Sequence, residues 1–337
     1  VGKDGLTSLT ATMLQEGTSS RTSQQIADEM EEMGSALRIE VARENLVISA
    51  EVLESQWQSA FEIMADVVRN AIFPQHDLDR IRRQRLTDLA RIADDPTSIA
   101  RRVATALLYG VDSTKGHPAA GTIQSIESLT RTDLSNHYKE RFGPTGTAIV
   151  ASGQVSVKTL TDLAERFLGD WQPQTILHQP DMPKAYGSDA NGETIYIADK
   201  PGAAQSVIRS AQTLIGRHHG DFMPLVILNQ VFGGEFSSRL NMNLRQDKGY
   251  SYGYMSSIAW AKNQSTLFTG GSVQTDVTSE SVLETLNEYA AIRSGRPVET
   301  SEFDDAVTGL LRGFPSRFES QSQISAQLAG LVSFDLP

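Results

Sequence analysis

The sequence predicts an α+β fold built from two homologous domains in tandem, each an antiparallel-rich sheet with helices packed on one face. The main observation is an internal repeat with a period of roughly 220 residues, which is typical of a duplicated domain and too long for a solenoid unit. Within each copy, strand-like segments joined as hairpins stand beside long amphipathic helices, a pattern that favours antiparallel sheets covered by helices. The length of 337 residues suits about two domains.

The first elements of the two copies follow the same order. The segments Gly17–Arg21 and Gly233–Arg239 each follow an apolar helical run and precede an amphipathic one. Each copy then enters a segment of alternating apolar and polar residues, at residues 36–53 and 252–274, in which a polar turn separates two strands. Both segments are predicted β-hairpins.

Helices follow both hairpins. In each copy a first helix ends at a proline-marked junction, a long helix with an acidic start comes next, and a further helix opens after it. The matched positions are residues 54–70 with 279–294, Phe73-Pro74 with Arg296-Pro297, and Ser98–Ala100 with Gln323–Ser325.

The two copies differ beyond these matched elements. The first copy continues with predicted helices at residues 130–141 and 157–168 and a predicted strand at residues 146–153. The second copy opens with predicted strands at residues 193–198 and 204–214, which have no counterpart in the first. Because each copy contains elements that the other lacks, we expect a chain that is truncated at both ends.

Domain boundaries follow from the repeat. Residues 173–192 contain several prolines and little apolar periodicity, which is typical of a linker. We therefore assign residues 1–172 to the first domain and residues 193–337 to the second.

Composition excludes several classes of protein. The chain has 30 Lys and Arg against 41 Asp and Glu, a net charge of −11, so it lacks the basic footprint of a nucleic-acid binder. No apolar run approaches the ~20 residues of a transmembrane helix. Cysteine is absent, which excludes disulfides, thiolate metal ligands and cysteine nucleophiles.

Known catalytic motifs are also absent from the sequence. The six histidines form neither H-E-x-x-H nor H-x-x-E-H, no G-x-S-x-G is present, and no Gly-Lys-Ser/Thr follows Gly233-Gly234. Arg80, Arg82, Arg83 and Arg85 form a basic run on one predicted helix, which is usually a solvated face and less often a docking surface. The residues alone predict no complete active site.

The first copy nevertheless resembles a family of metallopeptidases. The stretch Gly5–Thr18 is similar to the signature G-L-A-H-F-L-E-H-M-x-F-x-G-T of the M16 (pitrilysin/insulinase-like) zinc peptidases. Gly5, Leu6, Met13, Gly17 and Thr18 match this signature. The residues that bind zinc or activate water in the family are replaced. The resemblance places Ser8 and Thr12 where the family has its zinc-binding histidines and Ala11 where it has the general-base glutamate.

The third zinc ligand of the family is a glutamate on a later helix. The corresponding stretch here, Asp79–Arg91, contains no glutamate, and Thr87 or Asp88 falls nearest. A catalytic zinc ion needs about three protein ligands and an open water position, and neutral hydroxyls are poor ligands beside imidazoles or carboxylates. We therefore expect that this chain binds no metal. On the simplest interpretation, Ser8, Ala11 and Thr12 are ordinary residues on one face of a helix.

The second copy resembles the C-terminal half of the same family. The stretch from Gly233 to Tyr252 fits the pattern GG-x-x-S-S-R-L … L-R-x-x-x-G-x-x-Y. In M16 peptidases an arginine and a tyrosine seven residues apart reach the substrate backbone, and Arg245 and Tyr252 match that pair. The alternative is that Arg245 forms a local salt bridge and Tyr252 packs within its hairpin.

The resemblance implies a division of labour between two chains. Bacterial two-subunit members pair a chain that carries H-x-x-E-H with a chain that carries the Arg/Tyr pair and a degenerate zinc motif. This chain resembles the second kind, which implies a non-catalytic peptide-binding subunit, a zinc ion in the partner subunit, and a periplasmic or, alternatively, cytoplasmic location. Two other hypotheses are a structural scaffold like the core proteins of respiratory complexes, and a self-sufficient divergent zinc peptidase.

Overall fold

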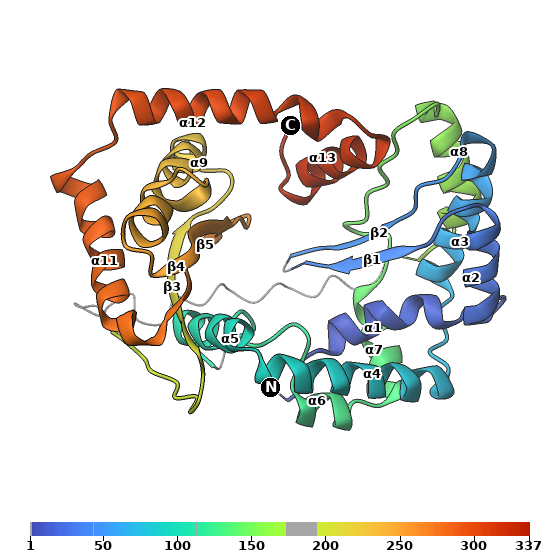
Figure 1. Ribbon diagram of the computed structural model, residues 1–337. Coiled ribbons are helices and arrows are strands. Elements are labelled where there is room, and N and C mark those ends of the chain that lie inside the picture. Colours follow the sequence, from blue (N-terminus) through green and yellow to red (C-terminus); the bar gives the residue numbers. More distant parts are fainter. Residues whose placement is uncertain (1, 43, 112, 173–193) are drawn as a thin grey trace.

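The computed structural model describes residues 2–42, 44–111, 113–172 and 194–337. The predicted linker at residues 173–192 lies outside these ranges. Figure 1 shows two halves side by side, the first in blue to green and the second in yellow to red. Within the described residues, no helix combines the length and apolar character needed to cross a membrane.

The first half is mostly helical. Its helices surround a two-stranded antiparallel sheet, β1 (Arg38–Val41) and β2 (Leu46–Ser49), in which Arg38 lies opposite Ser49. The helices are α1 (Leu6–Met13), α2 (Ser23–Glu32), α3 (Trp57–Arg69), α4 (Gln75–Asp94), α5 (Pro96–Tyr109), α6 (Ile123–Ser128), α7 (Arg131–Arg141) and α8 (Val157–Leu168).

Apolar periodicity accounts for the core of the first half. On α3, Ala60, Ile63 and Val67 are spaced by three and four residues, so they share one face, and all three are buried. On α1, Leu9 and Met13 are likewise four residues apart and join the same cluster. The core is therefore assembled from one apolar stripe on each helix.

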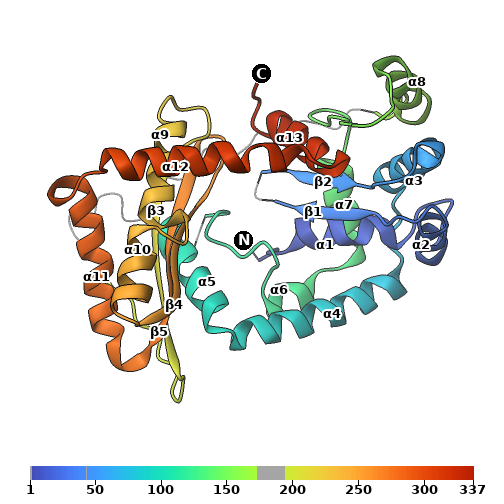
Figure 2. The same cartoon turned by 45° about the horizontal axis from the view of Figure 1, so that its top comes forward.

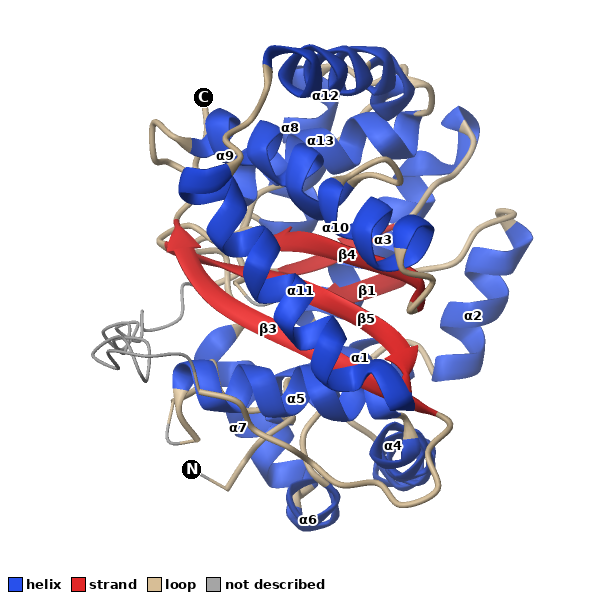
Figure 3. Cartoon of the chain, turned by 60° about the vertical axis from the view of Figure 1, so that its left-hand side comes forward, coloured by secondary structure: helices blue, strands red, loops and turns tan. Residues whose placement is uncertain are grey.

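The second half contains a three-stranded antiparallel sheet in the order β3-β5-β4. Its strands are β3 (Gln205–Ile215), β4 (Ser251–Ala259) and β5 (Gln264–Gln274), and its helices are α9 (Phe222–Asn229), α10 (Arg239–Asn241), α11 (Thr278–Ala290), α12 (Thr300–Gly313) and α13 (Gln321–Ser333). Figure 3 shows α11 lying across this sheet. A core around Phe232, Leu240, Leu244, Tyr254 and Val273 joins the helices to the strands.

Both faces of the second sheet are covered, by helices from different halves. Thr266 and Thr269 of β5 point to opposite faces because they are an odd number of residues apart. The Thr269 Oγ1 lies 2.6 Å from the hydroxyl of Tyr289 in the second half, whereas Thr266 shares a hydrogen bond with Tyr109 at the end of α5. Helix α5 therefore leaves the first half and packs on the sheet of the second.

The equivalent helix of the second half makes the reverse crossing. Helix α13 lies beside the β1–β2 hairpin in Figures 1 and 2, and the Asn45 side chain next to β2 donates a hydrogen bond to the Ser333 hydroxyl. In addition, the Ser152 hydroxyl lies 2.6 Å from the Gln321 carbonyl oxygen. Because the repeat matches α5 with α13, the two halves exchange equivalent helices.

The α+β prediction and both predicted hairpins are confirmed. Two other predicted strands are wrong, since residues 146–153 and 194–198 have no strand structure. A strand needs a neighbour that accepts its backbone hydrogen bonds, and none of the described strands lies alongside either segment. Several of their apolar residues, Ile149 and Ile197 among them, are consequently exposed.

Candidate functional site

Arg245 and Tyr252 flank a tight reversal of the chain. Helix α10 continues into a π-helical segment, Met242–Asp247, which carries Arg245. The chain then turns through Gly249, whose φ of +66° suits a glycine, and the Tyr250 N–H donates to the Leu244 carbonyl oxygen over 2.9 Å. This closed turn brings Tyr250, the residue before β4, beside Leu244, the residue before the arginine.

A β-bulge sets the position of Tyr252. Ser251 lies opposite Val273 and Tyr254 lies opposite Gly271, so β4 has one more residue than β5 across this stretch. The Ser251 hydroxyl oxygen accepts the Gly253 N–H over 3.0 Å and its proton reaches the Ser272 carbonyl oxygen over 2.7 Å. The extra residue leaves Tyr252 90% exposed, so the alternative in which this ring packs within its hairpin is wrong.

Arg245 has an aromatic neighbour and, among the described residues, no ion-pair partner. Its guanidinium carbon lies 4.3 Å from the ring centroid of Phe236, a cation–π contact. Residues close to Arg245 in the sequence contact carboxylates of α11, since Asn243 donates to Glu284 and Glu288, and Lys248 pairs with Glu284 over 3.4 Å. Across the described ranges no ion pair involves Arg245, which contradicts the local salt-bridge alternative.

The substituted metal-motif residues Ser8, Ala11 and Thr12 share one face of α1, as their spacing requires. The Ser8 hydroxyl donates to the Ala119 carbonyl oxygen over 2.6 Å, and the Thr12 hydroxyl donates to the Ser8 carbonyl oxygen over 2.9 Å. Ala11 is completely buried. Neither hydroxyl proton is therefore available to another ligand.

Arg85 of α4 binds both hydroxyl groups. Its Nη1 lies 3.2 Å from the Ser8 oxygen, and its Nη2 lies 3.1 Å from the Thr12 oxygen. Arg85 lies one helical turn from the buried Ile81 and one helical turn from the buried Leu89, so its side chain starts from the buried face of α4. That alignment is the sequence signal that could have identified Arg85.

The basic run on α4 is only partly a solvated face. Arg80 pairs with Glu16, and Arg82 donates to the carbonyl oxygens of Ile126 and Leu129 over 3.2 and 2.6 Å. Arg83 is exposed. Three of the four arginines thus contact other parts of the fold.

These residues do not fit a zinc ion. Two hydroxyls and a methyl group supply no imidazole or carboxylate, and the guanidinium of Arg85 brings a positive charge to their side. Among the residues that the structure describes, no group of three or more His, Asp and Glu side chains is placed to hold a metal ion.

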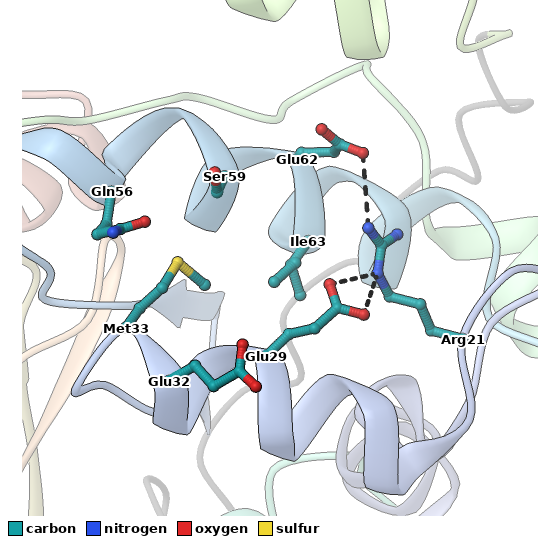
Figure 4. Close-up of a pocket in the computed structure, with 8 residues that line it drawn as sticks. All are labelled: Arg21, Glu29, Glu32, Met33, Gln56, Ser59, Glu62 and Ile63. Carbon is teal, nitrogen blue, oxygen red and sulfur yellow. Dashed lines mark hydrogen bonds and ion pairs between the residues drawn. The ribbon is translucent and has the colours of Figure 1, made fainter.

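A hollow of about 370 Å³ lies between α2 and α3. Figure 4 shows its lining, in which Arg21 points toward Glu29 and Glu62. The Arg21 guanidinium lies 3.0 Å from Glu29, 3.5 Å from Glu62 and 2.9 Å from Asp66. Because the positive charge of Arg21 is neutralised by these three carboxylates, we regard this hollow as a structural feature and not as a candidate site.

Comparison with known proteins identifies the family. The chain matches the description "Peptidase M16 inactive domain" over residues 128–310, more than half of its length, and "Insulinase (Peptidase family M16)" over residues 2–117. The chain belongs to peptidase family M16. The resemblance found in the sequence is therefore confirmed.

This chain matches only part of the length of its curated relatives in family M16. An uncharacterized zinc protease of Mycobacterium leprae is 28% identical over 246 residues, covering 73% of this chain and 55% of the relative. The corresponding values for an uncharacterized zinc protease of Bacillus subtilis are 24% identity over 289 residues, 84% of this chain and 68% of the relative. The chain thus spans about half to two thirds of the length of these curated relatives.

Solved structures share the M16 fold of this chain. A peptidase M16 inactive domain from Pseudomonas fluorescens is 24% identical, with a TM-score of 0.87 over 99% of this chain and 79% of that chain. A protease from Helicobacter pylori is 16% identical, with a TM-score of 0.88 over 99% of this chain and 81% of that chain.

Proposed function

We propose that this chain is a non-catalytic M16 subunit that binds unfolded peptides and pairs with a second M16 chain carrying H-x-x-E-H, which holds the zinc ion. The proposal rests on the surroundings of Arg245 and on the exposure of Tyr252. The arginine is free of carboxylates in the described part of the chain, and the tyrosine is 90% exposed. Both side chains are therefore available to a ligand.

The chemistry of the two groups suits a peptide backbone. A guanidinium presents a planar fork of N–H donors, and a phenol adds an O–H donor, whereas a peptide offers carbonyl oxygens as acceptors. The Phe236 ring beside Arg245 restrains the guanidinium before a ligand arrives, which lowers the entropic cost of binding. In the complex, these donors orient the peptide beside the catalytic centre of the partner.

The test measures peptide turnover by the complex of this chain with its H-x-x-E-H partner. We expect Arg245→Ala to lower turnover by roughly a hundredfold to a thousandfold, the range found when one oriented donor is removed, and Tyr252→Phe to lower it less. Matched controls are Arg293→Ala and Tyr196→Phe, because both residues are exposed.

The same assay separates the proposal from a scaffold role. Co-elution of the two chains on size exclusion, measured for every variant, shows whether the complex still assembles. A complex that assembles normally and cleaves peptides at an unchanged rate with Arg245→Ala would overturn the peptide-positioning role and leave only the scaffold.

A further inference from the structure

Arg85 differs from two other arginines that are at least half-buried, Arg21 and Arg239. Arg21 has Glu29, Glu62 and Asp66 as ionic partners, and Arg239 has Glu302. Arg85 is also half-buried, yet its hydrogen bonds within the described chain go to two neutral hydroxyl oxygens, those of Ser8 and Thr12.

The charge of Arg85 is under-compensated. A guanidinium has five N–H donors, and the two bonds to Ser8 and Thr12 leave three of them for other acceptors. Asp88, one turn further along α4, attracts the charge through space but forms its own ion pair with Arg91 over 3.3 Å. Burial lowers the pKa of Arg85, and this effect outweighs the attraction of Asp88. A partly desolvated cation of this kind favours an anionic ligand.

The two hydroxyl groups hold the cation in place. The Ser8 and Thr12 protons are directed to the carbonyl oxygens of Ala119 and Ser8, so the hydroxyl lone pairs can face the guanidinium. Both residues belong to α1, whereas Arg85 belongs to α4, so the contact also ties the two helices together. A restrained arginine is a pre-organised receptor, because little side-chain entropy remains to be lost on binding.

We propose that Arg85, positioned by Ser8 and Thr12, is a carboxylate-binding site at the place that the M16 metal motif occupies in this chain. The ligand is the carboxylate of a peptide, either its free C-terminus or an acidic side chain. A guanidinium binds a carboxylate through two parallel N–H···O bonds, which the free donors of Arg85 allow. Where the M16 motif binds a cation, the substituted motif of this chain thus binds an anion. This inference rests on the proposed function, since it names a feature of the bound peptide.

The test uses isothermal titration of the isolated full chain with short peptides. One peptide has a free C-terminus and an internal glutamate; its two relatives carry an amidated C-terminus or glutamine in place of the glutamate. We expect roughly tenfold weaker binding for the relative that lacks the recognised carboxylate, which distinguishes the two sources.

Variants connect this selectivity to Arg85. We expect Arg85→Gln to bind all three peptides with equal, weak affinity and Arg85→Lys to keep part of the selectivity, since lysine retains the charge without the fork. Arg83→Gln is the matched control, because Arg83 is an exposed arginine on the same helix. Thermal melting of each variant checks that it is folded.

Two results would overturn the carboxylate site. One is equal affinity of the wild-type chain for all three peptides, which needs no variant to fold. The other is unchanged selectivity in a folded Arg85→Gln chain. Neither result depends on the partner subunit, whereas failure of the proposed function appears as unchanged turnover of the Arg245→Ala complex, so the two failures are distinguishable.

Discussion

Arg239 on α10 and Glu302 on α12 form an ion pair through two hydrogen bonds, with 2.7 Å between the arginine Nε and the glutamate Oε1. The same guanidinium donates to the carbonyl oxygens of Arg296 and Pro297. Arg21, which the repeat matches with Arg239, lies 2.9 Å from Asp66 on α3. The arginine that ends the repeated motif therefore anchors the fold in both copies.

We predict that Arg239→Ala lowers the free energy of unfolding by up to about 3 kcal/mol, because removing the buried arginine leaves the half-buried Glu302 without its counter-ion. Urea denaturation of the variant and the wild type measures this difference. Arg293→Ala, at an exposed position, serves as the control and should change stability by less than about 0.5 kcal/mol. Equal midpoints for Arg239→Ala and the wild type would contradict the anchoring role.

The same pair makes stability depend on pH. The hydrogen bonds from Arg239 hold the pKa of Glu302 below its ordinary value of 4.5. The unfolded chain then binds more protons than the folded chain between these two pKa values, so the contribution is complete above about pH 4.5 and is lost as the pH falls through the folded pKa. Melting temperatures from pH 7 to pH 3 should fall less steeply for Glu302→Gln than for the wild type, and parallel curves would exclude this carboxylate as a cause.

Arg85 should oppose zinc binding even when ligands are restored. We predict that a chain with Ser8→His, Ala11→Glu and Thr12→His stays free of zinc after dialysis, because the guanidinium repels a divalent cation at the same face. Adding Arg85→Glu removes this charge and supplies a third ligand, so about one zinc ion per chain is expected. Elemental analysis gives both values. Because Ala11 is completely buried, circular dichroism must first show that each chain is folded.

Tyr109 should couple the two halves of the chain. It is 1% exposed and joins α5 to β5 through Thr266. We predict that Tyr109→Ala destabilises the chain by about 3 kcal/mol, the lower end of the range for a large aromatic core residue. Tyr196→Ala, at a position that is 62% exposed, is the control. Denaturation followed by tryptophan fluorescence measures both, and a Tyr109→Ala midpoint that matches the control would show that α5 contributes little to the second half.

Local patterns in the sequence predicted much of the fold. The hairpin at residues 36–53 and the strands at residues 204–214 and 252–274 follow from alternation, which depends only on neighbouring residues. The strand predicted at residues 146–153 fails for the opposite reason, since Ile149 and its neighbours need a pairing strand that the local pattern does not reveal. The exchange of α5 and α13 between the halves could not be predicted either, because periodicity identifies an apolar face but not the surface that covers it.

Within the candidate site, the sequence by itself determined the family resemblance, the loss of the metal ligands and the positions of Arg245 and Tyr252, since these depend on residue identity and spacing. Tertiary structure alone decided how those residues are arranged and what they contact. The bulge after Ser251 exposes Tyr252, Phe236 restrains Arg245, and Arg85 reaches Ser8 from a helix about 77 positions further along the chain. Such contacts join segments that are distant in sequence, and their chemistry follows from side chains that only the packed fold brings within hydrogen-bonding distance.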